Sequence, residues 1–111
     1  MRLPETDLAR ISAYCAGSSP RNLADQLRTE HHVRGHSVTL CEARTLWHGG
    51  DWVCHRFGQL RYRSTSHDWA LYWADRNDRW YPYDPDGYHL IGTVRELLDE
   101  VERDPTSIFR G

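Results

Sequence analysis

The chain has 111 residues, of which 39% are hydrophobic and 12% aromatic, and its formal net charge is −2. This composition excludes a disordered chain, and the length predicts one domain over residues 1–111. The sequence has no apolar run near the roughly 20 residues of a membrane helix and no signal-peptide pattern at its start, so we expect a cytoplasmic protein without membrane contact.

All 14 basic residues are arginines. Without lysine, the chain cannot form a Schiff base, use a P-loop lysine or use a lysine as general base. Charge is uneven along the chain: residues 21–65 hold seven arginines and four acidic residues, whereas residues 66–111 hold five arginines and ten acidic residues. The middle of the chain is therefore mildly basic and the C-terminal part acidic.

The first predicted element is a helix over residues 5–16. Leu8, Ile11 and Cys15 recur at helical spacing and form one apolar face. Gly17 follows the last residue of this pattern and can end the helix.

From about residue 26 the hydrophobic period changes to two, which is typical of strands. Gly35 separates the first two predicted strands as a hairpin turn, and Gly58 marks a plausible bulge in the third. The five predicted strands are "QLRTEHHVR" (26–34), "SVTLCEARTLW" (37–47), "VCHRFGQLRYR" (53–63), "WALYWAD" (69–75) and "WYPYD" (80–84). We expect loops at "HGGD" (48–51) and "YDPDGYHLIG" (83–92), which are rich in turn residues.

A second helix is predicted to begin at "TVRE" and to end before Pro105. Thr93 and Glu96 have the spacing of a capping box. An apolar stripe follows at Val94, Leu97, Leu98 and Val101. The apolar residues of the tail, Ile108 and Phe109, are expected to dock on the body of the domain.

These elements predict an α+β fold in which an N-terminal helix, a five-stranded antiparallel meander and a C-terminal helix follow one another. Both helices are amphipathic and need the same apolar layer, so we expect them to cover one face of the sheet. The opposite face would then be solvated or paired with a second molecule.

The two faces can be assigned if the last three strands are joined by two-residue turns at Ser66-His67 and Asn77-Asp78. Under this assumption Leu60 lies opposite Trp73, Arg61 opposite Tyr72, Asp75 opposite Trp80, Tyr72 opposite Tyr83, and Trp73 opposite Pro82. The face beneath the helices carries Leu60, Tyr62, Trp69, Leu71, Trp73, Trp80 and Pro82. The other carries Arg61, Arg63, Ala70, Tyr72, Ala74, Tyr81 and Tyr83.

The second of these faces is the candidate binding surface, with Arg61, Arg63, Tyr72, Tyr81 and Tyr83 as its site residues and all five substantially exposed. Tyrosine rings stack on bases and arginines pair with phosphates, so single-stranded nucleic acid is one possible partner. Protein interfaces and homodimer contacts favour the same residues. Ordinary cross-strand packing is the third interpretation, because tyrosine is common in strands.

No catalytic motif is present, and we expect no cofactor, no metal and no catalytic residues. The three cysteines, Cys15, Cys41 and Cys54, are expected to be buried thiols. The alternative is a small enzyme or metal-binding protein that uses the histidine-rich first hairpin. It predicts a pocket in which His31 or His32 meets Glu30, Glu42 or Cys41, although adjacent histidines on a strand cannot easily share one metal.

Three segments, "LPETDLARISAYC", "LYWADRNDRWYPYD" and "DPTSIFRG", resemble a small bacterial, mainly actinobacterial, single-domain family of unknown function. The resemblance covers essentially the whole chain. It implies a class of protein and a type of host, and it transfers no activity and no functional residues. The sequence therefore favours a small non-enzymatic binding or interaction protein.

Overall fold

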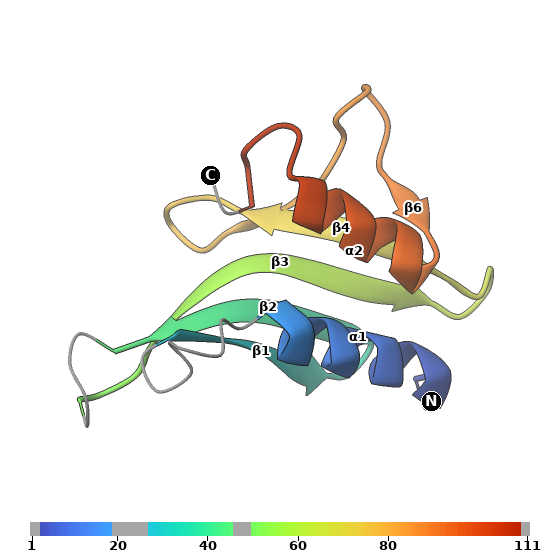
Figure 1. Cartoon of the computed structure of the whole chain (residues 1–111). Coiled ribbons are helices and arrows are strands. Elements are labelled where there is room, and N and C mark those ends of the chain that lie inside the picture. The colour runs from blue at the N-terminus through green and yellow to red at the C-terminus, as the bar shows by residue number, and fades with distance from the viewer. Residues whose placement is uncertain (1–2, 19–26, 46–49, 110–111) are drawn as a thin grey trace.

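A computed structural model describes residues 3–18, 27–45 and 50–109 of the chain. These residues form helices and antiparallel strands that are joined by turns and loops. The predicted α+β fold is confirmed (Figure 1). In chain order the elements are α1 (Glu5–Ser18), β1 (Leu27–Arg34), β2 (Ser37–Arg44), β3 (Val53–Arg63), β4 (Asp68–Ala74), β5 (Trp80–Pro82), β6 (Ile91–Gly92) and α2 (Val94–Arg103). Residue 26 and residues 46–49, which fell within predicted strands or the predicted "HGGD" loop, lie outside the described residues.

Strands β1 to β5 lie side by side in chain order, each antiparallel to the next, as the meander prediction required. A short additional strand was missed: β6 pairs with β4 through Trp69↔Gly92 and Ala70↔Ile91. It lies within the segment predicted as a loop. Two residues are too few to show a hydrophobic period, so the sequence pattern carries no signal for such a strand.

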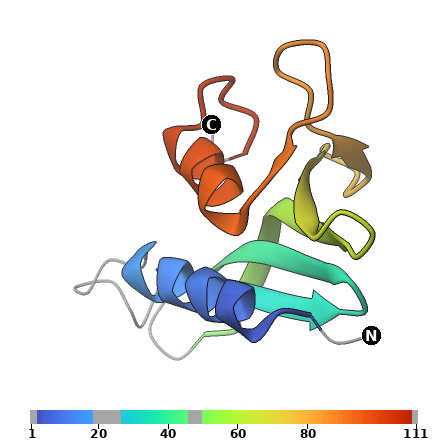
Figure 2. The same cartoon turned by 90° about the vertical axis from the view of Figure 1, so that its right-hand side faces the viewer.

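Both helices cover one face of the sheet, α1 over β1 and α2 beside β4 (Figures 1 and 2). The predicted capping box of α2 is present, with the Thr93 hydroxyl accepting from the Glu96 amide and the Glu96 carboxylate accepting from the Thr93 amide. The bond from the Thr93 amide to the Glu96 carboxylate is the main reason that the pKa of Glu96 is lowered. No helix in the described ranges is long and apolar enough to cross a membrane.

The core lies between the helices and the sheet. Val38, Leu60 and Leu71 are opposite one another on three neighbouring strands and are fully buried. The tail docks as predicted, because Phe109 is 3% exposed and its ring lies 4.8 Å from that of Tyr83. The buried members of the cluster are Leu3, Ile11, Cys15, Val38, Leu40, Phe57, Leu60, Trp69, Leu71, Tyr83, Val94, Leu97, Leu98, Val101 and Phe109.

The turn between β4 and β5 differs from the predicted two-residue turn. The Asp75 carboxylate accepts hydrogen bonds from the amides of Asn77 (2.9 Å) and Arg79 (3.0 Å), and Asp78 adopts a left-handed φ of 61°. The amide of Asp75 also donates to the Arg79 carbonyl, so the loop holds three residues, 76–78.

The pairing of β4 with β5 therefore slips by one residue from the prediction. Trp73 lies opposite Tyr81, and Ala74 lies opposite Trp80. Because side chains alternate along a strand, this slip exchanges the faces on which the β5 side chains lie. Trp80 and Pro82 are on the face away from the helices, and Tyr81 is on the face of Trp73.

The turn between β3 and β4 also differs from the prediction, since Arg63 pairs with Asp68 and the loop holds four residues. Leu60 lies opposite Leu71 and Arg61 opposite Ala70, two residues away from the expected partners. A slip of two residues preserves the side-chain alternation, so the predicted faces of β3 and β4 are right although their partners are wrong.

Tyr83 was predicted to be exposed and is instead buried beneath α2, with 2% of its surface accessible. Its hydroxyl donates a 2.7 Å hydrogen bond to Glu100, and the amide of Tyr83 donates to the Leu71 carbonyl. Burial, and then the bond to Glu100, raises the pKa of Tyr83 to about 12.

We therefore expect an alkaline loss of stability that depends on Tyr83. The folded-state pKa of Tyr83 is above the ordinary value of about 10, so its protonated hydroxyl stabilises the fold. This stabilisation is complete below about pH 10 and is lost as the pH rises towards 12. Tyr83→Phe should lower the free energy of unfolding at neutral pH by about 1–3 kcal/mol and weaken the alkaline dependence. Urea unfolding at several pH values measures both effects, and an alkaline dependence that is the same in Tyr83→Phe as in the original chain would contradict the assignment.

Candidate binding site on the open face of the sheet

The face of the sheet opposite the helices is called here the open face. Its side chains follow from the register: Ser37 and Thr39 alternate with the buried Val38 on β2, and their β3 partners are Arg61 and Gln59. Four polar side chains from two central strands therefore point away from the helices.

A β-bulge at Phe57 adds further side chains to this face. Leu40 pairs with Gly58 but the next residue, Cys41, pairs with Arg56, which leaves Phe57 as the extra residue. If the same residues formed a regular strand with no bulge, strict alternation would place Arg56 on the same side as the core residue Leu60. The bulge, which Gly58 suggested in the sequence, turns Phe57 into the core and brings Arg56 onto the open face.

A hollow of about 550 Å³ lies on the open face, and we call it the arginine hollow. It combines three arginines and a histidine with one tryptophan, and no carboxylate of the described chain lines it. None of the three arginines makes an ion pair with a described carboxylate. The lining residues are His32, Arg34, Ser37, Thr39, Cys54, Arg56, Gln59, Arg61 and Trp80.

Arg61 is held in place by contacts on two sides. Its Nε donates a 2.6 Å hydrogen bond to Gln59, whose amide donates in turn to the Thr39 hydroxyl at 3.0 Å. Its guanidinium lies 3.8 Å from the ring centroid of Tyr72, and the rings of His89 and Tyr72 pack in a T-shaped arrangement. The guanidinium is thus ordered before any ligand arrives, which lowers the entropy cost of binding.

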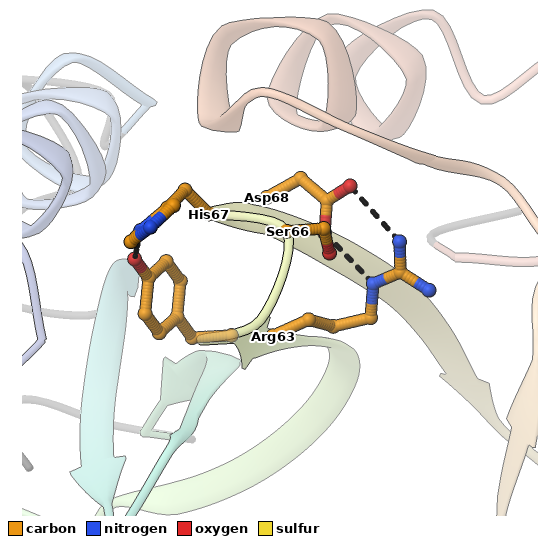
Figure 3. A network of polar contacts seen from close by, with 5 residues as sticks. Arg63, Ser66, His67 and Asp68 are labelled. Carbon is orange, nitrogen blue, oxygen red and sulfur yellow. Dashed lines mark hydrogen bonds and ion pairs between the residues drawn. The ribbon is translucent and has the colours of Figure 1, made fainter.

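Arg63 is on the open face, as predicted, but it lies at the end of the sheet and is bound to a carboxylate. Figure 3 shows its guanidinium reaching across the turn to Asp68, with hydrogen bonds of 2.7 and 3.0 Å. Ser66 donates to the same carboxylate. These donors, with Arg63 the strongest, hold the pKa of Asp68 below its usual range. Arg63 is therefore part of the turn.

The structure brings together only part of the predicted site. Arg61 and Tyr72 lie on the open face and contact each other. Tyr81 lies on the other face, with its ring 5.2 Å from that of Trp73 and 39% of its surface exposed. Tyr83 is buried in the core, so neither of these two tyrosines can act with Arg61.

Arg61 is the one predicted binding residue among those that line the arginine hollow. Trp80, Arg34 and Arg56 are the cationic and aromatic lining residues that were missed, and His32 was considered only in the alternative based on the first hairpin. Trp80 was assigned to the core because the turn before it was assumed to hold two residues. Asp75, whose carboxylate can stabilise a longer turn, was the available signal for the correct length. Arg56 was missed because only the bulge places it on the open face. Arg34 and His32 lie on alternate positions of β1, whose pairing with β2 places His32 opposite Thr39.

Charge is separated between the two sides of the molecule. Helix α2 presents Glu96, Asp99, Glu100 and Glu102 around a second hollow on the helix side, with Arg103 as its one basic lining residue. The arginine hollow lies on the opposite side of the sheet. The net charge of −2 therefore conceals a local positive field at the arginine hollow.

The cysteines correct another prediction. Cys41 and Cys54 form a disulfide between β2 and β3, with their Cα atoms 5.9 Å apart, rather than two buried thiols. Cys41 is buried, Cys54 is exposed at the edge of the arginine hollow, and Cys15 is on the buried face of α1, in the core. His32 and Cys41 do lie close together, as the alternative hypothesis required, since the side-chain ligand atoms of His32, Cys41 and Cys54 lie within 4.8 Å of one another.

Comparison with known proteins identifies the family to which the chain is similar. A family model described as a domain of unknown function, DUF3024, matches residues 2–111. No curated protein and no solved structure matches the chain significantly.

Proposed function

Because the chain belongs to the DUF3024 family, whose function is unknown, we propose from its geometry that it is a non-enzymatic binding protein that takes single-stranded nucleic acid on its open face. One observation carries the proposal: the arginine hollow joins three arginines that have no described carboxylate partner with an aromatic ring. Phosphate groups and planar bases are the two chemical groups that such a combination recognises.

The arginines supply the contacts to phosphate. A guanidinium offers a planar set of donors that matches two phosphate oxygens, and Arg34, Arg56 and Arg61 converge on one hollow. Trp80 supplies a ring on which a base can stack, a contact that tolerates any base. A hollow of about 550 Å³ has the size of a site for one ligand unit, so the rest of a strand would follow the surface of the sheet.

The overall negative charge does not oppose this arrangement, because the acidic residues of α2 are on the far side of the sheet. The local field attracts phosphate, whereas the net charge limits non-specific attraction to long polyanions. We therefore expect modest affinity with a clear dependence on salt.

The test is fluorescence anisotropy with labelled single-stranded DNA and RNA at low and at near-physiological salt. Arg61→Gln should weaken binding several-fold and reduce the salt slope by about one, because one phosphate contact is lost. Arg63→Gln is the matched control, since Arg63 is two positions away on the same face but is bound to Asp68, and it should change affinity little. Equal losses in the two variants, or no binding by the folded protein, would refute the proposal.

A protein partner or a second copy of the chain is the second candidate. The observation in its favour is that β1 is the outer strand of the sheet and carries Val33 with 51% of its surface exposed. An outer strand can pair with a strand from another molecule. Light scattering over a range of concentrations distinguishes a monomer from a dimer.

A further inference from the structure

We propose that His32, Cys41 and Cys54 form a Zn²⁺ site beside the arginine hollow when the disulfide is reduced. Their ligand atoms all lie within 4.8 Å of one another. Among the described residues 3–18, 27–45 and 50–109, no other group of three or more His, Cys, Asp or Glu residues could hold a metal ion in this way. This proposal does not depend on nucleic-acid binding.

Three neighbouring strands bring these residues to one place. His32 on β1 lies opposite Thr39, two positions along β2 from Cys41, and both side chains are on the open face. The bulge at Phe57 shifts Cys54 of β3 onto that face as well. The adjacent His31 is opposite the core residue Leu40 and points the other way.

The donor set fits zinc. Two thiolates and an imidazole are ligands that Zn²⁺ prefers, at about 2.3 Å for sulfur and about 2.0–2.1 Å for nitrogen. Tetrahedral geometry needs the two sulfurs to be about 3.8 Å apart. This requires only small side-chain rotations, because the Cα atoms of Cys41 and Cys54 are 5.9 Å apart.

Neighbouring residues support the ligands. The Glu30 carboxylate lies 3.5 Å from Nε2 of His32, a contact that would orient the imidazole and leave Nδ1 to bind the metal. Arg56 and Arg61 line the same hollow as Cys54, and positive charge close to a sulfur favours the thiolate that a metal requires. Three protein ligands leave a fourth coordination position, which can take water or an anion.

The disulfide and the metal site exclude each other. A dithiol reductant gives two electrons and two protons to the Cys41–Cys54 bond, forms its own disulfide and leaves two thiols. Zn²⁺ then replaces the two thiol protons, which pass to solvent. The oxidised chain keeps only His32 of the three ligands and is not expected to retain zinc.

The test measures zinc in the full chain, oxidised and reduced, by elemental analysis after gel filtration. A phosphine serves as reductant, because a dithiol competes for zinc. The phosphine becomes a phosphine oxide with oxygen from one water molecule, and the two protons of that water protonate the two thiolates. We expect one zinc per reduced chain and none per oxidised chain. Co²⁺ in place of Zn²⁺ should give the near-ultraviolet absorption of metal–thiolate bonds.

Variants assign the ligands. Cys54→Ser should abolish zinc binding, and His32→Gln should weaken it at least about tenfold. His31→Gln is the matched control and should bind like the original chain. Circular dichroism checks that each variant is folded, which is expected because His32 and Cys54 are exposed. A folded reduced protein without zinc, or zinc retained by Cys54→Ser, would overturn the proposal.

Discussion

Replacing Trp69 with alanine is expected to lower the free energy of unfolding by about 3–5 kcal/mol. Trp69 is 1% exposed, and its ring lies 5.1 Å from that of Tyr62. Its indole nitrogen donates a 2.9 Å hydrogen bond to Asp7 on α1, so the side chain ties that helix to β4. The substitution removes a large buried surface and leaves a cavity between a helix and the sheet.

Urea unfolding measures this effect, and Trp52→Ala is the matched control. Trp52 is 37% exposed, and its described contact is with the guanidinium of Arg28, 4.0 Å from the ring centroid. Such a contact contributes about 0.5–1 kcal/mol. Since small domains have a total stability of about 5–15 kcal/mol, the Trp69 variant should be close to unfolding at room temperature. Similar losses in the two variants would show that Trp69 is not the centre of the core.

Replacing Trp80 with alanine is expected to weaken binding of single-stranded nucleic acid by about 1–3 kcal/mol, or roughly fivefold to 150-fold in Kd. Trp80 is the aromatic residue that lines the arginine hollow, and one stacked base would be lost with it. This is the largest effect on binding that we expect from a single substitution.

Tyr81→Ala is a closely matched control for this experiment. Tyr81 is the next residue on β5 and is also aromatic, but the observed register places it opposite Trp73 on the other face. It should leave the affinity measured by fluorescence anisotropy nearly unchanged. A larger loss for Tyr81→Ala than for Trp80→Ala would contradict the placement of the binding surface on the open face.

The elements of the fold apart from β6 could be predicted because each of them has a local signal. Thr93 and Glu96 mark the start of α2 by a capping box, and Ile11 with Cys15 gives α1 its apolar face. The alternation of apolar residues in β2 and β4 indicated strands, and short connections favoured a meander.

The faces of the last strand could not be predicted with the same certainty, because Trp80 and Tyr81 are both large and aromatic. Hydrophobic alternation cannot choose between two such neighbours, so the choice depends on the length of the preceding turn. That length is set by the Asp75 carboxylate, which stabilises a three-residue loop in place of the assumed two-residue turn.

The residues that β1 and the first half of β3 contribute to the site could not be predicted without knowing how the strands pair in three dimensions. His32, Cys41 and Cys54 belong to three strands, and their spacing in sequence matches no metal or disulfide motif. Only the sheet order and the bulge bring them together. Arg61 and Tyr72 were found because both follow the regular alternation of β3 and β4.

The extra residue at Phe57 has a consequence for comparing members of the family. Deleting it would leave a regular strand in which Gly58 still pairs with Leu40 and Arg56 with Cys41, so Cys54 and Arg56 would stay on the open face while the core lost one large side chain. A one-residue gap at this point in a relative should therefore preserve the same set of side chains on the open face, even though the strand is one residue shorter.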